Sequence, residues 1–278
     1  MQESALPPIV VVKLGGEVVT SPQLPVIAQD LVTIAAQMPV VVVHGGGAQA
    51  TALQRALGQE PVIVHGRRVT DAAALDVMKM VVAGRLNVDL CSALVAAGGQ
   101  PVGLHGASSC VLKAVKTKGF KNIATGALDT ETEYGFVGDV VGVHRALLET
   151  LLRSGFLPVL ACLGADEAGQ TYNINADAAA NGIAATLAAR TVVLISDVPG
   201  VLRDIADPST RFPRLNRSEA SQLMSEGVIR AGMIPKLEES FAALDAGAGS
   251  VVIVGRLGPG DLAKAILEPG SLGTVLTA

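Results

Sequence analysis

Two short glycine clusters, each beside a polar side chain, are the residues of this sequence best suited to binding an anion. They read Lys13-Leu14-Gly15-Gly16 and His44-Gly45-Gly46-Gly47. Glycine lets backbone N–H groups approach an anion closely, and the N-terminus of a following helix adds a favourable dipole. Lys13 supplies a mobile charge that suits phosphoryl oxygens. One such cluster alone is well explained as a turn after a strand, but the two together indicate a phosphate site.

Three other clusters hold more polar groups than a loop or a helix end requires. Arg68, within Gly66-Arg67-Arg68-Val69-Thr70-Asp71, could grip a carboxylate through two hydrogen bonds, although a solvated surface charge explains it equally well. The run Asn173-Ile174-Asn175-Ala176-Asp177 opens a helical pattern, and capping accounts for only one of its three polar residues. Gly232-Met233-Ile234-Pro235-Lys236 places a lysine in the first turn of a helix, where the dipole disfavours it. That lysine indicates an anionic partner unless it faces solvent.

Several established classes of site are excluded. The chain has no Gly-x-x-x-x-Gly-Lys-[Ser/Thr] motif, so it is not a P-loop protein. The run 45–50 lacks the third glycine of the dinucleotide fingerprint, and no Gly-x-Ser-x-Gly accompanies the His-Gly-Gly-Gly run as in an esterase. With 21 Lys and Arg against 25 Asp and Glu, and no Trp, the sequence offers neither a basic field nor a stacking platform for nucleic acid.

Alternating strands and helices must position these candidate residues. Continuous runs of β-branched residues predict buried parallel strands, and the segments between them have helical periodicity. The predicted strands are 9–12, 39–43, 157–160, 191–195 and 251–254, with weaker candidates at 62–64 and 101–104. The predicted helices are 22–37, 48–57, 71–97, 143–154, 175–189, 217–226, 232–247 and 259–268. The alternation predicts an α/β fold, a three-layer αβα sandwich around a mostly parallel central sheet.

Two regions interrupt this pattern. The polar interval 111–141 contains short β-prone pieces and predicts antiparallel hairpins at an edge of the sheet or in a lid. Residues 188–190 are the place where an N-terminal lobe and a C-terminal lobe would separate.

The sequence predicts a cytoplasmic protein. No basic segment precedes the first apolar run, so no signal peptide is expected, and the apolar runs are too short to span a membrane. The three cysteines form no Cys-x-x-Cys pair and leave an odd thiol, as is typical of a reducing compartment.

Taken together, the motifs between Val10 and Thr277 resemble the amino acid kinase family, and within it the kinases that act on an N-acetylated glutamate. The two glycine clusters are shared loosely across that family, whereas the runs 68–71, 173–177 and 232–236 are far more specific. Further markers are Gly135-Phe136-Val137-Gly138 and Ser196-Asp197-Val198-Pro199-Gly200. The resemblance implies the carbamate kinase-like fold of the family. It also implies phosphoryl transfer from ATP, with Mg²⁺, to the side-chain carboxylate of N-acetyl-L-glutamate in arginine biosynthesis.

The resemblance also implies a role for each motif residue. Lys13 and Lys236 would be catalytic clamps on the transferring phosphoryl group, and Asp177 would hold both lysines in position. The other residues are substrate-binding Gly46, Gly47, Arg68, Asn173 and Asn175, and nucleotide-binding Gly15, Gly16, Asp197, Val198, Gly200, Val201, Leu202, Val228, Ile229 and Arg230. No metal ligand is expected from the protein, since magnesium would arrive on the phosphates of ATP. The lobe 1–188 would bind the acyl amino acid and dimerise, and the lobe 189–278 would bind ATP.

Departures from the family pattern leave alternatives open. An apolar residue is usual where Arg67 stands, so Arg67 either faces solvent or alters the rim of the pocket. Residues 104–109 also differ, which leaves open how the lid at 104–139 closes. With only twelve residues before Lys13, the resemblance implies a homodimer that arginine does not inhibit.

The alternative functions are a kinase of N-acetylated or carrier-linked aminoadipate in lysine biosynthesis, and a non-catalytic amino-acid sensor of the same fold. Whether a regulatory protein docks on the surface is left open.

Overall fold

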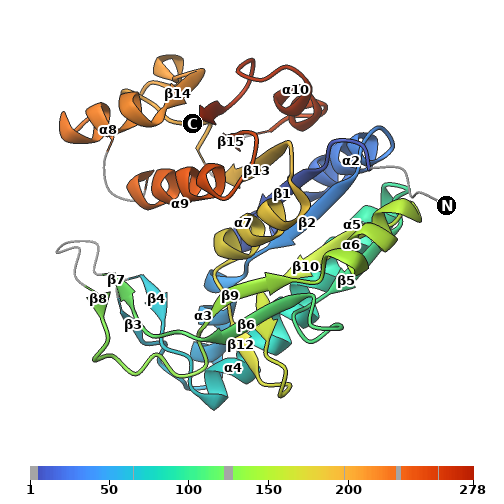
Figure 1. Cartoon of the computed structure of the whole chain (residues 1–278), viewed down its shortest axis with the longest axis vertical. Coiled ribbons are helices and arrows are strands. Elements are labelled where there is room, and N and C mark those ends of the chain that lie inside the picture. Colours follow the sequence, from blue (N-terminus) through green and yellow to red (C-terminus); the bar gives the residue numbers. More distant parts are fainter. Residues whose placement is uncertain (1–5, 65, 122–127, 197, 230–232, 256) are drawn as a thin grey trace.

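The computed structural model describes residues 6–64, 66–121, 128–196, 198–229, 233–255 and 257–278. Its central element is an eight-stranded sheet with the strand order β14-β16-β15-β13-β1-β2-β10-β5 (Figure 1). Neighbouring strands are parallel except for the antiparallel pair β15 and β16. The prediction of a mostly parallel sheet is therefore confirmed. The strands are β1 (Val10–Leu14), β2 (Val40–His44), β5 (Pro101–Leu104), β10 (Leu157–Ala161), β13 (Thr191–Ser196), β14 (Arg214–Asn216), β15 (Val251–Gly255) and β16 (Thr274–Thr277).

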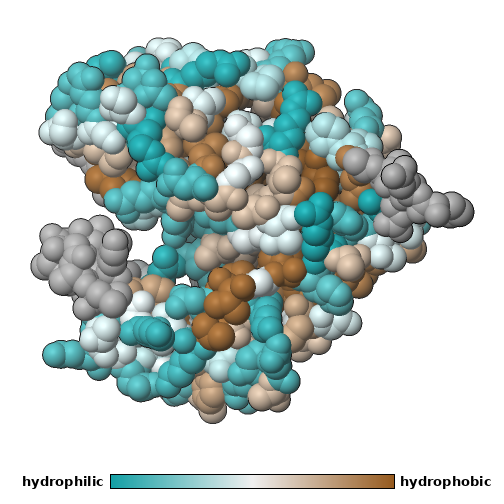
Figure 2. Space-filling view, in the orientation of Figure 1, coloured by the Kyte–Doolittle hydropathy of each residue, from teal (hydrophilic) through white to brown (hydrophobic). Residues whose placement is uncertain are grey.

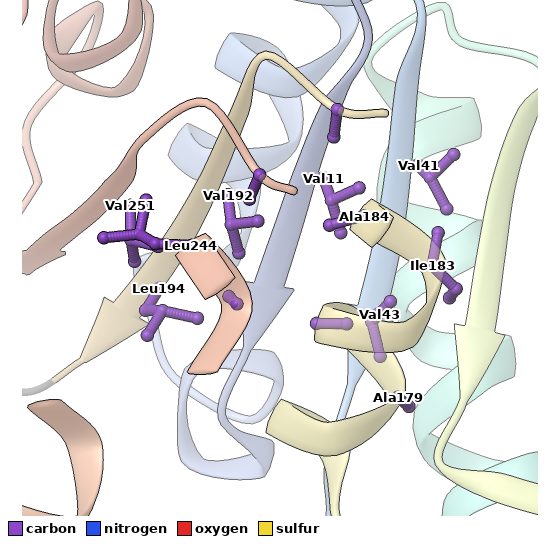
Figure 3. Close-up of a cluster of buried hydrophobic side chains, with 14 of the residues drawn as sticks. Val11, Val41, Val43, Ala179, Ile183, Ala184, Val192, Leu194, Leu244 and Val251 are labelled. Carbon is purple, nitrogen blue, oxygen red and sulfur yellow. The ribbon is translucent and has the colours of Figure 1, made fainter. Parts of the chain in front are cut away.

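Helices cover both faces of this sheet, as the three-layer prediction requires. Residues such as Val11 and Val192 pack on one face against side chains of α7 and α9 (Figure 3). Val10 and Val12 belong to a separate core cluster with residues of α2, α5 and α10 on the opposite face. Both clusters form because successive strand residues point to opposite faces, so a run of valines fills both. The helices are α1 (Gly16–Val19), α2 (Leu24–Ala35), α3 (Gly47–Ala56), α4 (Ala72–Met78), α5 (Asn87–Ala96), α6 (Arg145–Arg153), α7 (Ala176–Leu187), α8 (Arg217–Ser225), α9 (Met233–Asp245) and α10 (Asp261–Leu267).

The helix predicted at 71–97 is continuous but not uniform. Its middle, η1 (Lys79–Leu86), is a π-helix that joins α4 to α5. A π segment forms its hydrogen bonds one residue further along than an α-helix does, and such segments often lie at functional sites. The stretch begins at a side-chain cap, since the side chain of Asp71 accepts a hydrogen bond of 2.8 Å from the backbone N–H of Ala74.

The polar interval 111–141 forms antiparallel pairs, as predicted, but not at an edge of the main sheet. Strand β6 (Leu112–Lys116) pairs with β9 (Gly138–Val143), and β7 (Phe120–Lys121) pairs with β8 (Leu128–Asp129). The first pair belongs to a separate four-stranded sheet, β12-β11-β6-β9, completed by β11 (Leu163–Ala165) and β12 (Thr171–Asn173). A fourth sheet contains only the hairpin of β3 (Ile63–Val64) and β4 (Arg67–Arg68).

The strands that sequence patterning missed are short. β11, β12 and β14 have three residues each, and β16 has four. Segments of this length are too brief to show a hydrophobic period, so only pairing with a longer neighbour defines them.

In the residue ranges given above, no helix combines the length and the apolar character that crossing a membrane would require. The thiols of Cys91, Cys110 and Cys162 are free.

Candidate active site

The two glycine clusters lie side by side because the strands before them are parallel neighbours in the sheet. Lys13 is level with Val43, and Leu14 is level with His44, so both strands end at the same edge. A Cβ added to Gly16 would come within 2.6 Å of the Cα of Gly46. The contact between the clusters therefore leaves no room for a side chain, and backbone N–H groups can line the space that the clusters enclose.

We call Gly16 and Gly46 the glycine pair, and Gly46 also lies against the π segment. A Cβ on Gly46 would lie 2.6 Å from the Cδ1 of Leu86 and 2.9 Å from the Cγ2 of Val82. Both residues belong to η1, and both are buried. The glycine at position 46 is thus fixed by packing and not only by the turn.

We expect Gly46→Ala to lower the free energy of unfolding by about 1–3 kcal/mol, because the methyl group overpacks this contact. Thermal and urea unfolding monitored by circular dichroism measure the change. Gly47→Ala is the matched control, since a Cβ on Gly47 has no neighbour within 4 Å. Equal stability of the two variants would show that η1 yields readily and that packing does not require glycine at position 46.

Lys13 and Asp177 form an ion pair at this edge of the sheet. The Nζ of Lys13 lies 2.9 Å from the Oδ1 of Asp177, and their side chains are 16% and 20% exposed. Asp177 lies in the first turn of α7, where the helix dipole favours a negative charge. The cap of α7 is Asn175, whose side chain accepts hydrogen bonds from the backbone N–H groups of Asp177 and Ala178. The predicted contact between Lys13 and Asp177 is therefore present.

Lys236 reaches the same region from α9. Its Nζ donates a hydrogen bond of 2.6 Å to the Oγ of Ser196, the last residue of β13. Ser196 was not among the predicted site residues, although side chains at the carboxyl ends of parallel strands are where this class of fold places its ligands. Two lysines from distant segments thus flank the glycine pair, one held by Asp177 and one in contact with Ser196.

Arg68 and Asn173 are joined through Thr70. The side chain of Asn173 donates a hydrogen bond of 3.1 Å to the Oγ1 of Thr70. This hydroxyl in turn donates a hydrogen bond of 3.0 Å to the backbone carbonyl of Arg68. The Arg68 guanidinium donates to the carbonyl of Gly47 at 2.9 Å, to Thr51 at 2.6 Å, and to Gln54. The Arg68 guanidinium is therefore fixed along one side of α3.

Three cavities collect the predicted residues. The arginine cavity, of about 480 Å³, is lined by Gly46, Gly47, Arg68, Asn173, Asn175 and Asp177, among others. The lysine cavity, of about 400 Å³, is lined by Lys13, Gly15, Gly16, Ser196 and Lys236, among others. The apolar cavity, of about 910 Å³, is lined by Val198, Gly200, Val201, Leu202, Val228, Ile229 and Lys236, among others. Lys236 lines both the lysine cavity and the apolar cavity. Lys13 lines the lysine cavity and Asp177 lines the arginine cavity, so their ion pair joins these two.

Two predicted residues, Asp197 and Arg230, lie outside the described part of the chain. Every other predicted site residue lines one of the three cavities. Prediction missed Glu239, which interacts with Arg67 beside the arginine cavity. Glu239 follows Lys236 by three residues on α9, and that spacing places both on one side of the helix. Helical periodicity was the signal that could have found it.

His44 is fully buried beneath the glycine pair. Its Nδ1 lies 3.1 Å from the carbonyl of Gly45, and its Nε2 lies 3.0 Å from the side-chain nitrogen of Asn87. Since Asn87 donates from that nitrogen, Nε2 is the acceptor and Nδ1 carries the proton, which makes the ring neutral. Burial lowers the pKa of His44, and the hydrogen bond to Gly45 offsets only part of this effect.

We expect acid to destabilise the fold through His44. The unfolded chain binds a proton at this site with a pKa of 6.5, whereas the folded chain resists it. The free energy of unfolding should therefore fall as the pH drops below about 6.5, until the lowered pKa of the folded state is reached. Urea unfolding between pH 7.5 and 5 measures the slope. His44→Gln should flatten it, and the exposed His144→Gln should not; a slope unchanged by both would assign the acid sensitivity to other groups.

Comparisons with known proteins cover most of this chain. The model of the amino acid kinase family matches residues 8–255. An acetylglutamate kinase of Sorangium cellulosum is 58% identical over 267 residues, which cover 96% of this chain and 93% of the relative.

Two solved structures share the fold. An N-acetylglutamate synthase of Neisseria gonorrhoeae, complexed with coenzyme A and N-acetyl-glutamate, has a TM-score of 0.81 at 23% identity, covering 98% of this chain and 59% of that one. Carbamate kinase of Giardia lamblia, bound to AMP-PNP, has a TM-score of 0.64 at 17% identity, covering 97% and 98%. At these identities the likeness concerns the architecture.

Proposed function

This chain belongs to the amino acid kinase family, and from that premise we infer that it transfers the terminal phosphoryl group of ATP to the side-chain carboxylate of N-acetyl-L-glutamate. The product is N-acetyl-L-glutamyl 5-phosphate, and the reaction is a step of arginine biosynthesis. The observation that carries the inference is the near-full-length identity of 58% to an acetylglutamate kinase. The order of the three cavities, with two lysines between an arginine-lined space and an apolar one, supports it.

We propose that the acceptor occupies the arginine cavity. Arg68 would bind its α-carboxylate, and Asn173 and Asn175 would bind neighbouring polar groups. The N–H groups of Gly46 and Gly47 would line the path of the reacting carboxylate. That carboxylate has an ordinary pKa near 4.3, so it is already ionised at neutral pH and no general base is needed.

The lysines would supply the charge that the transfer requires. As a carboxylate oxygen bonds to the γ-phosphorus, the bond to the β-phosphate oxygen breaks and ADP leaves with the electron pair. Catalysis of such a transfer is mainly alignment and neutralisation of charge on the equatorial oxygens. Lys13 and Lys236 line the lysine cavity from different segments of the chain. Asp177, which pairs with Lys13, would orient both lysines rather than accept a proton.

We propose that ATP spans the other two cavities. Its phosphates would lie in the lysine cavity against Gly15 and Gly16, and its adenosine in the apolar cavity, whose lining is largely aliphatic. In the described residues, no three His, Cys, Asp or Glu side chains form a metal site. We propose that Mg²⁺ enters on the phosphates of ATP, where it would supply further neutralisation of charge.

The proposed places of the acceptor and of ATP assign a different role to each part of the chain. The part up to residue 188 would bind the acyl amino acid and dimerise, and the part from 189 would bind ATP. Support for a homodimer comes from Met80, Val88 and Val95, which are 53%, 60% and 60% exposed on the helical stretch from η1 to α5. The molar mass in solution, measured by light scattering, tests whether the chain is a homodimer.

The free thiols support a cytoplasmic location.

A coupled assay of ADP release tests the proposed reaction. Mg²⁺-ATP would be offered with N-acetyl-L-glutamate, with glutamate and with N-acetyl-aminoadipate. We expect a clear preference for N-acetyl-L-glutamate in kcat/KM. A preference for aminoadipate would keep the mechanism and change the acceptor by one methylene, and no turnover with any of the three would overturn the proposal.

A further inference from the structure

One pair of charged side chains beside the arginine cavity has no part in the proposed chemistry. Arg67, on β4, lines this cavity next to Arg68. Its Nη2 donates a hydrogen bond of 3.1 Å to the Oε1 of Glu239 on α9. The two side chains are 30% and 27% exposed, so water screens them only partly. Of the two positions expected for Arg67, solvent or the rim of the pocket, the structure places it at the rim.

Arg67 is also held from a second direction. Its Cζ lies 5.2 Å from the centre of the Phe120 ring, a distance at which a cation is attracted to the face of an aromatic ring. Phe120 in turn packs edge-on against Tyr134, with ring centres 4.9 Å apart. The guanidinium therefore lies between an aromatic ring and a carboxylate, which leaves it little freedom to swing into solvent.

Glu239 connects this arginine to the first turns of α7, where Asp177 pairs with Lys13. Its Oε1 also accepts a hydrogen bond of 3.4 Å from Asn175, and its backbone carbonyl accepts one of 3.0 Å from Asn181, which is in α7. Burial raises the pKa of Glu239 and the neighbouring Asp177 raises it further, whereas Arg67 lowers it. Arg67 is thus the cation that helps to keep Glu239 charged beside the Lys13–Asp177 pair.

The pair joins the two sides of the site. Arg67 and Arg68 are adjacent on the β3–β4 hairpin, and Glu239 lies one helical turn after Lys236 on α9. In Figure 1 this hairpin and α9 lie on opposite sides of the opening that Figure 2 shows at the left of the molecule. We propose that the Arg67–Glu239 pair is a positioning device, which sets α9 and Lys236 at the distance from Arg68 that phosphoryl transfer requires. The inference rests on the proposed function.

A double-mutant cycle tests it. In Arg67→Leu and in Glu239→Gln, we expect kcat to fall about tenfold, because a small misplacement of aligned groups slows transfer strongly. KM for ATP should change less than about twofold. The double variant should lose no more than the worse single variant. This non-additivity of about tenfold corresponds to about 1.4 kcal/mol of coupling. Arg67→Lys, which keeps a cation near Glu239, should recover part of kcat.

A matched control exists on the same helix. Arg217, at the start of α8, donates 2.6 Å to Asp245 at the end of α9, and its Cζ lies 4.8 Å from the centre of the Phe241 ring. This pair repeats the chemistry of Arg67, Glu239 and Phe120, but its residues line none of the three cavities. Arg217→Leu and Asp245→Asn should leave kcat unchanged, whatever they do to thermal stability.

The pH profile provides a readout that a purely structural role would not move. Glu239 interacts with Arg67 of β4 and with Asn175 and Asp177 at the start of α7. Lys13 pairs with Asp177, and Lys236 precedes Glu239 by three residues on α9. Burial raises the pKa of Glu239, and protonation would remove one charge of the pair, so kcat/KM of the wild type should fall on the acid side as Glu239 titrates. Because Arg67→Leu and Glu239→Gln have already lost the pair, this acid limb should be absent from both.

The outcomes separate the two levels of inference. If the wild-type enzyme phosphorylates N-acetyl-L-glutamate but the single variants keep its kcat, or if their losses add, the positioning role is wrong and the proposed function stands. An equal loss of kcat in the Arg217 and Asp245 variants would also overturn the positioning role, since the effect would then be general to α9. Absence of turnover in the wild type would overturn the proposed function first.

Discussion

Replacing Lys236 with alanine is expected to lower kcat about 10²–10³-fold, with KM for N-acetyl-L-glutamate changed less than about threefold. The size of the loss is that of removing one preorganised group aimed at developing charge. Lys236 borders both the lysine cavity and the apolar cavity, so its ammonium would lie where the γ- and β-phosphates separate. Charge that matters most in the transition state appears in kcat and not in KM.

Initial rates at saturating Mg²⁺-ATP measure this effect, with single-turnover mixing to isolate the chemical step. Lys264→Ala, which removes an exposed lysine from α10, is the control for loss of a positive charge and should leave kcat as it is. The contact of Lys236 with Ser196 offers a second comparison. Ser196→Ala keeps the charge and removes one positioning contact, so its loss of kcat should be smaller. A large rise in KM at constant kcat would contradict the role of Lys236.

Replacing Arg68 with alanine should raise KM for N-acetyl-L-glutamate about 30-fold or more, with a smaller change in kcat. Loss of one partner from a desolvated charge pair costs about 2 kcal/mol or more. The Arg68 guanidinium already makes hydrogen bonds to Gly47, Thr51 and Gln54, so it is preorganised before the acceptor arrives. A preorganised fork loses little freedom on binding, and this favours a strong contribution to affinity.

The same contacts suggest a competing explanation that the experiment can distinguish. If Arg68 only braces α3, Arg68→Ala should lower thermal stability and raise KM for both substrates to a similar extent. If it binds the acceptor carboxylate, KM for ATP should stay constant and calorimetry should show weaker binding of N-acetyl-L-glutamate alone. Arg68→Lys keeps the charge without the planar fork, and it should give an intermediate KM in the second case only.

Much of this architecture could be predicted because buried parallel strands have continuous apolar sequences. Val10–Leu14 and Val40–His44 show this most clearly, and the glycines after each run mark the edge where ligands bind. The predicted residues from Lys13 to Ile229 could be grouped for the same reason. Once two strand ends are known to be neighbours, the loops that follow them must meet.

The rest depended on contacts between segments with no local signature. Nothing near Arg67 in the sequence indicates that its partner is Glu239, because that pair exists only after α9 packs over the site. Ser196 looks like an ordinary strand end until Lys236 reaches it. The π segment is hidden for a related reason. Its residues fit an α-helical pattern, and the extra residue is visible only in the hydrogen bonds of the folded chain.

That π segment makes chain length, and not only residue identity, a constraint on the site. An α-helix turns about 100° per residue, and the π segment already holds one extra residue, so inserting another between Lys79 and Leu86 would rotate the whole of α5 by about that angle relative to α4. Asn87 would then leave both His44 and the carbonyl of Val159, to which its side chain donates at 3.1 Å. Insertions should therefore be tolerated poorly here. A chain one residue longer at this point would have to find another support for its glycine loop.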